Sequence, residues 1–162
     1  MVMQQLRPTL FDRLCDDAPS APTESAAAYV VSASELRAIV MRDLAFLLNA
    51  TNLDDLIDHR RHGAVASATV SFGIPPLAGT QASERRWVDI ERALRRAILD
   101  HEPRLLPESV RVTPVSVPRA LGGAQILHFE IDALIDARPY PLSLTVQSAF
   151  DLETSRVRTA PT

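Results

Sequence analysis

Hydrophobic side chains recur at helical spacing in two stretches of the chain. The first begins after Ser32, which has with Glu35 the spacing of a capping box, and we expect it to end near residues 49–52. Its apolar stripe consists of Leu36, Ile39, Val40, Leu44, Leu47 and Leu48. The second covers residues 84–100, with Ser83 as the expected N-cap and Pro103 as the residue that prevents continuation. The pattern predicts two long amphipathic helices, the second with a stripe of Trp87, Ile90, Leu94, Ala97 and Ile98.

Apolar and polar residues alternate with a period of two in three later stretches, residues 110–117, 125–135 and 142–152. In the second of these, Phe129 falls on one face and Glu130 on the other. The turn signal Gly122-Gly123 separates the first two, and residues 136–141 separate the second from the third. We therefore predict an α+β fold, in which two helices pack on a three-stranded antiparallel meander with one polar face.

The outer strands of this predicted sheet differ in how well they are protected. Along residues 110–117 the valines change parity at Thr113-Pro114, which indicates a bulge at an edge. Residues 142–152 alternate regularly and contain no proline. We expect this third strand to leave an unpaired edge that can accept a strand of another protein.

The two ends of the chain differ from this central region. Leu10, Phe11 and Leu14 can form one apolar turn of helix, whereas residues 16–28 are rich in proline, serine and alanine and resemble a flexible linker. The apolar turn suits docking on a partner or folding back onto its own domain. We divide the chain into a docking segment and linker (1–33), an α+β domain (34–153) and a loose tail (154–162).

Composition narrows the function classes. The chain has 162 residues, enough for one domain, and 46% of them are hydrophobic without any run long enough to span a bilayer. Its formal net charge is −3, and all 17 basic residues are arginines, so phosphate-loop lysine chemistry is excluded. The arginine pairs lie next to acids, which disfavours nucleic-acid binding. Cys15 is the single cysteine, and no secretory signal precedes it, so we expect a cytoplasmic protein.

Two groups of residues could carry chemistry. Asp55, His59 and His62 have helical i, i+4, i+7 spacing but form an incomplete metal set, so we expect surface residues and neither metal nor cofactor. Glu91 and Glu102 are the candidates for the carboxylate pair of a glycosidase. Both stand beside arginines, which favour the charged form of a carboxylate over the proton donor that such an enzyme needs. We expect no catalysis, and a carboxylate-dependent peptidoglycan hydrolase stays the alternative.

Four short segments resemble a known family when taken in order. They are Leu-Phe-Asp-Arg-Leu (10–14), Leu-Leu-Asn (47–49), Ser-Phe-Gly-Ile-Pro (71–75) and Glu-Pro-Arg (102–104). Together they resemble the TssE family of bacterial type VI secretion baseplates, which is similar to the wedge protein of contractile phage tails that is often labelled lysozyme-like. The chain departs from the family pattern at residues 49–51, Asn-Ala-Thr where Asn-Thr-Arg is usual.

The resemblance implies a structural role. A TssE-like protein joins the baseplate subunits TssF and TssG, with TssK nearby, to the first ring of the TssB/TssC sheath, in the cytoplasm at the inner face of the inner membrane. The Glu-Pro-Arg motif is implied to grip the helical core of the wedge. The candidate partner-binding residues are Glu102, Pro103, Arg104, Leu10, Phe11 and Leu14. A regulatory binding module on the same fold is a further alternative.

Overall fold

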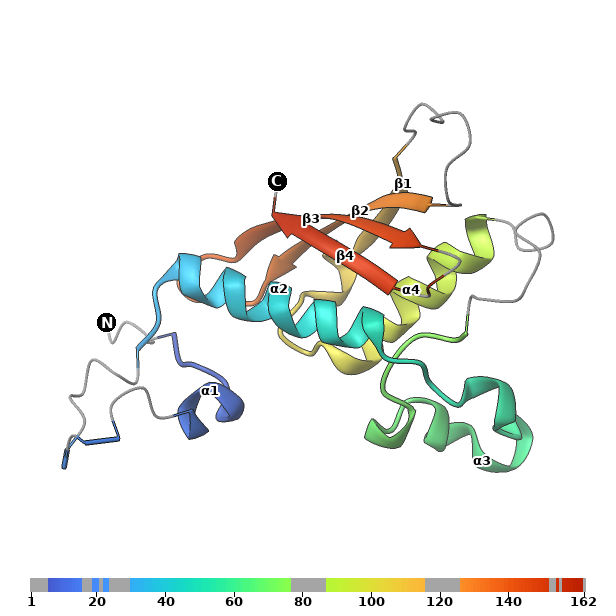
Figure 1. Ribbon diagram of the computed structural model, residues 1–162, viewed down its shortest axis with the longest axis horizontal. Helices are drawn as coiled ribbons and strands as arrows, with labels where there is room; N and C mark the ends of the chain where they lie inside the picture. Colours follow the sequence, from blue (N-terminus) through green and yellow to red (C-terminus); the bar gives the residue numbers. More distant parts are fainter. Residues whose placement is uncertain are drawn as a thin grey trace.

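Four antiparallel strands follow one another along the chain and form one sheet in the order β1-β2-β3-β4 (Figure 1). They are β1 (Arg111–Pro114), β2 (Ile126–Ile135), β3 (Leu142–Asp151) and β4 (Arg156–Pro161). The structure is a computed structural model of the 162 residues, and it describes residues 6–15, 19–20, 22–23, 30–76, 87–115, 126–151, 154 and 156–161. The α+β class predicted from the sequence is confirmed, with four strands in place of three.

Two long helices, α2 (Ala33–Asn49) and α4 (Trp87–His101), cover one face of this sheet (Figure 1). The capping box of Ser32 and Glu35 is present at the start of α2. The predicted stripes of both helices pack against the inward-facing residues of the strands, such as Phe129, Ile131 and Val146, which are at most 1% exposed. Hydrophobic periodicity therefore predicted correctly which sides of the helices and strands face the core.

The prediction of an unpaired edge at the third strand is wrong. β4 pairs with β3 from Val146 opposite Pro161 to Asp151 opposite Arg156. The expected loose tail is thus a strand over residues 156–161, and its Val157 packs into the core opposite Phe150. β4 has six residues, and only Val157 among its described side chains belongs to the core cluster, so its hydrophobic pattern is too short to predict a strand from the sequence. Its stability comes from the neighbouring strand and helix.

The bulge predicted at Thr113-Pro114 is also wrong. β1 pairs with β2 in an unbroken register from Arg111 opposite Asp132 to Pro114 opposite Phe129. The next residue continues the ladder, since the Val115 N–H donates to the His128 carbonyl at 2.9 Å. The valines change parity because Val112 faces the core whereas Val115, at 40% exposed, faces outward on a short edge strand.

Short helices connect these elements. They are α1 (Leu10–Leu14), η2 (Asp54–Leu56), α3 (His59–Ala66), η3 (Thr69–Ser71) and η4 (Pro107–Ser109). Asp55 lies in η2, and His62 has non-helical backbone angles inside α3, so Asp55, His59 and His62 do not share one regular helix. The described side chains contain no group of three residues suited to a metal ion. Ser83, the Gly122-Gly123 turn and most of the 16–28 linker lie outside the described residues.

Candidate partner-docking surface

The Glu-Pro-Arg segment forms a corner between α4 and the sheet. The helix ends at His101, as Pro103 predicts, and Leu105 then forms an isolated bridge with Ile135 at the end of β2. Hydrogen bonds flank this bridge, from the Leu106 N–H to the Leu134 carbonyl and from the Asp136 N–H to the Arg104 carbonyl, both 2.8 Å. The backbone of Arg104 is therefore held by the sheet as well as by the helix.

Glu102 points into its own chain. The residue is 5% exposed, and its carboxylate accepts hydrogen bonds from the backbone N–H, Nε and Nη2 of Arg104, the Nε bond at 2.6 Å. The sequence led us to expect that this acid reaches a partner directly. In the structure both of its oxygens hold Arg104, so Glu102 positions the guanidinium.

A line of charged groups runs from this corner to the N-terminal segment. Arg104 Nη2 also donates to Asp43 at 2.7 Å, and the other oxygen of Asp43 accepts from Arg42 Nη2 at 2.8 Å. Arg42 in turn holds both oxygens of Asp12 in α1. We call these five residues, Asp12, Arg42, Asp43, Arg104 and Glu102, the ion-pair ladder.

The ladder shifts the pKa values of three of its members. The hydrogen bond from Arg42 lowers the pKa of Asp12 to about 2, and the same bond raises the pKa of Arg42. For Arg104, burial acts to lower the pKa, but hydrogen bonding and Coulomb attraction to Glu102 and then Asp43 outweigh it and raise the pKa overall. These three groups therefore keep their charges near neutral pH.

The N-terminal segment folds back onto its own domain. Leu6 packs against the core, and its carbonyl accepts from the Val31 N–H at 3.0 Å. The Phe11 ring lies 5.2 Å from the Arg42 guanidinium carbon. Leu10, Phe11 and Leu14 are nevertheless 70%, 60% and 74% exposed. Folding back thus orders α1 without burying its apolar residues.

Two aromatic side chains stand between α1 and the corner. Phe46 on α2 is 59% exposed, and Phe72 is 40% exposed and makes a T-shaped contact with His101, the ring centroids 5.4 Å apart. An open hollow of about 380 Å³ lies between these groups, lined by Thr9, Asp43, Phe46, Leu47, Phe72, His101, Glu102, Pro103 and Arg104. The hollow, the corner and the exposed residues of α1 form what we call the docking surface.

Gly73 places Phe72 at this surface. Its φ of +124° is a conformation that side-chain-bearing residues rarely adopt, and a Cβ there would lie 2.4 Å from the Ala50 carbonyl oxygen. That close approach lets the Ile74 N–H donate to Ala50 at 2.9 Å and the Asn52 N–H donate to Ile74 at 2.9 Å. The Ser-Phe-Gly-Ile-Pro segment is thereby fastened to the end of α2.

Sequence reasoning named part of this surface, and the binding role of those residues stays a prediction. It identified Leu10, Phe11, Leu14 and the corner, but it missed Arg42 and Asp43, whose partners are distant in the chain. Phe46 carried a readable signal, because it is an aromatic residue outside the apolar stripe of a predicted helix. A solvent-exposed aromatic beside an arginine is a common composition for a protein-binding site.

The two carboxylates considered for hydrolysis, Glu91 and Glu102, line different hollows. Both oxygens of Glu102 accept hydrogen bonds from Arg104, which suits a structural anion. Near Glu91, Arg92 pairs with Asp89 at 3.1 Å and Arg95 donates to the Val110 carbonyl at 3.1 Å. Glu91 belongs to the outer side of α4, among residues that line a different hollow from the one at the corner.

Residues 34–140 match the family described as baseplate wedge protein gp25. The chain belongs to this family. The gp25 family is the one that contains TssE, so the resemblance noted in the sequence is confirmed. No curated protein and no solved structure shows significant similarity to the chain.

Membership in the gp25 family indicates a structural role in a phage or type VI secretion baseplate. The matched region contains α2, α4, β1, β2 and the corner, whereas α1, β3 and β4 lie outside it. Among the described residues, no helix is long and apolar enough to cross a membrane.

Proposed function

We propose that the chain is the wedge component of a type VI secretion baseplate that joins TssF and TssG, with TssK nearby, to the first TssB/TssC sheath ring. It would act in the cytoplasm, at the baseplate on the inner face of the inner membrane. Its contribution is binding and positioning, without a catalytic step. The gp25 family match supports the baseplate role, and the docking surface supports the contact with TssF and TssG.

One observation carries the proposed contact with TssF and TssG: Arg104 is fixed in place before any partner binds. The sheet holds its backbone, while Glu102 and Asp43 hold its guanidinium beside the exposed rings of Phe46 and Phe72. Rigid arginine and aromatic side chains lose little conformational entropy on association, which is why they dominate binding energy at many interfaces. A prearranged surface of this kind fits a permanent assembly part.

The proposed sheath contact does not lie at the edge of β3. β4 covers the outer edge of β3, so the third strand is not the place where a sheath strand can pair. The outer strands of the described sheet are β1 and β4. Each of these strands contains one proline, Pro114 or Pro161, which cannot donate a backbone hydrogen bond to an added strand.

Replacement of Phe46 by serine tests the docking surface without disturbing the core. We expect Phe46→Ser to weaken capture of the TssF–TssG complex about tenfold, because a truncated interface aromatic commonly costs more than 1 kcal/mol of binding energy. The matched control is Val88→Ser, an exposed apolar residue at 52% on α4. Both variants should melt within a few degrees of the parent protein. Unchanged capture by a folded Phe46→Ser protein would refute this role for the surface.

A further inference from the structure

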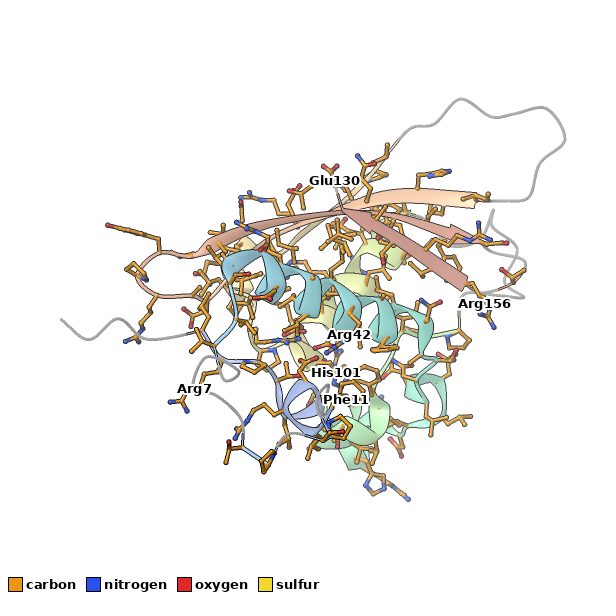
Figure 2. All side chains as sticks on the ribbon, turned by 60° about the vertical axis from the view of Figure 1, so that its left-hand side comes forward. Arg7, Phe11, Arg42, His101, Glu130 and Arg156 are labelled. Carbon is orange, nitrogen blue, oxygen red and sulfur yellow. The ribbon has the colours of Figure 1, made fainter. Side chains whose placement is uncertain are left out.

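We propose that a hollow at one end of the sheet binds an acidic peptide segment of another protein, with one carboxylate seated over Ala149 between His128 and Arg158. The open hollow has a volume of about 910 Å³, which is room for several side chains. It lies where β2 begins, β3 ends and β4 begins. Figure 2 shows Arg156 at this end of the sheet, apart from Phe11 below α2. The site is separate from the docking surface, so the inference goes beyond the proposed contact with TssF and TssG.

Three neighbouring strands bring the lining of this hollow together. His128 on β2 lies opposite Ala149 on β3, and Ala149 lies opposite Arg158 on β4. All three residues point away from the core, because an adjacent residue on each strand is buried in it. Two strand spacings place the backbones at His128 and Arg158 about 9.5 Å apart. The alanine methyl between them fills little of this space, so it forms the floor of the hollow.

The guanidinium groups of Arg156 and Arg158 are available to a ligand. Both side chains are exposed, and neither forms a hydrogen bond or an ion pair within the part of the chain that the structure describes. By contrast, every arginine on α2 and α4 donates to an acid or to a backbone carbonyl. The chain as a whole is acidic, with a formal net charge of −3, so a hollow with two unpaired arginines is a local reversal of charge.

Arg158 is the stronger anchor of the two arginines. Arg156 lies opposite Asp151, whose carboxylate attracts it across the strands. The row of Arg158 contains Ala149 and His128 but no acid. His128 is half-buried and lines the same hollow, where its imidazole supplies a ring N–H donor. A carboxylate over Ala149 can therefore accept hydrogen bonds from both walls.

The charges around the hollow favour a single carboxylate over a phosphate chain. Two guanidinium groups and Asp151 give the hollow a formal charge of +1 with His128 neutral, and one carboxylate balances this charge. Farther along the same face, β2 carries Glu130 and Asp132. A nucleic acid would meet these acids, because its negative charges repeat along its whole length.

An apolar residue beside the carboxylate also suits the hollow. Ile126 lines it and is 49% exposed, so an apolar side chain of the ligand can cover it. The backbone groups of β2 and β3 pair with each other here, so the ligand is held by its side chains and not as an added strand. The occupant is therefore a peptide segment in which an acidic residue stands next to an apolar one.

A capped pentapeptide with the sequence Ser-Leu-Glu-Leu-Ser tests the site by NMR on the full chain. We expect the peptide to shift the backbone amide signals of Ala149, Arg156 and Arg158 in a saturable way. The same peptide with glutamine in place of glutamate should bind about fivefold more weakly, which is the scale of one ion pair at a surface. Equal binding of the two peptides, or unchanged signals at these amides, would overturn the inference.

Substitution of Arg158 distinguishes a defined site from general attraction between charges. Arg158 is exposed, so Arg158→Gln should fold like the parent protein and bind the glutamate peptide about fivefold more weakly. The matched control is Arg111→Gln, which removes an exposed arginine on the same face of the sheet but outside the hollow. This control should bind the peptide like the parent protein. Equal weakening in both variants would refute a site centred on Arg158.

Inorganic phosphate and a short single-stranded DNA test the other anionic ligands. Both should bind more weakly than the glutamate peptide at the same ionic strength, because the acids beside the hollow repel additional negative charge. Tighter binding of either one at the same amides would overturn the carboxylate ligand. All of these outcomes are independent of the capture of TssF and TssG, which Phe46→Ser tests on the docking surface.

Discussion

The ion pair of Glu102 and Arg104 contributes both to the fold and to the docking surface. Glu102 is buried with its carboxylate on Arg104, and Arg104, with a side chain 27% exposed, reaches from that buried acid toward the docking surface. A buried charge is tolerated only when it is paired, so the acid depends on the arginine. This dependence makes Arg104 unsuitable as a simple probe of binding.

Removal of Arg104 should destabilise the protein. We expect Arg104→Ala to lower the free energy of unfolding by about 3 kcal/mol, because it leaves Glu102 buried and unpaired. Urea unfolding measures the change. The double variant Glu102→Gln/Arg104→Gln carries no buried charge and should recover at least half of the loss. Equal destabilisation in both proteins would show that packing, and not charge, is responsible.

Asp12 gives α1 a pH dependence. Arg42 holds the pKa of Asp12 at about 2, below its ordinary 3.8, so the docked state gains stability above pH 3.8 and loses it as the pH falls through about 2. A spin label at Cys15 should therefore become more mobile between pH 4 and pH 2 while circular dichroism still reports a folded sheet. In Asp12→Asn the mobility should be high throughout, and a pH-dependent change there would point to another group.

At the scale of elements, hydrogen bonds from the end of α2 fasten two other segments, one through a side chain and one through the backbone. Asn49 donates to the Val157 carbonyl and accepts from the Val157 N–H, both at 3.0 Å. Its side chain thus takes the place of a neighbouring strand along the outer edge of β4, and this contact helps to order residues that we expected to be loose. The Gly73 contact fastens the Ser-Phe-Gly-Ile-Pro segment to the same helix end.

Substitution of Gly73 should break the second of these attachments. We expect Gly73→Ala to lower the free energy of unfolding by about 2 kcal/mol or more, because a Cβ would clash with the Ala50 backbone and φ is +124°. The control is Gly63→Ala in α3, where no atom lies within 4 Å of the added carbon and alanine favours the helix. Thermal unfolding distinguishes the two. A Gly73→Ala protein as stable as the parent would contradict the close approach.

At the scale of the whole molecule, the docking surface and the open face of the sheet lie on different sides. Figure 1 shows α1 and α3 on the side of α2 that faces away from the sheet. The far face of the sheet carries polar residues such as Glu130, Asp132 and Thr145, with Thr145 donating to Asp132 at 2.8 Å. Two surfaces of different chemistry, one apolar and one polar, suit a part that joins two other assemblies.

The sequence by itself determined the amphipathic helices, the antiparallel strands and their inward faces, because hydrophobic periodicity is a local property set by backbone geometry. It also determined where α4 ends, since Pro103 acts on its own neighbours. Only the tertiary structure decided that β4 covers β3, that Glu102 turns inward and that Asp12 meets Arg42. In the ladder, the bonds from Arg42 to Asp12 and from Arg104 to Asp43 join groups that are 30 and 61 residues apart. Their energy comes from burial and charge pairing in the folded state, which no local pattern records.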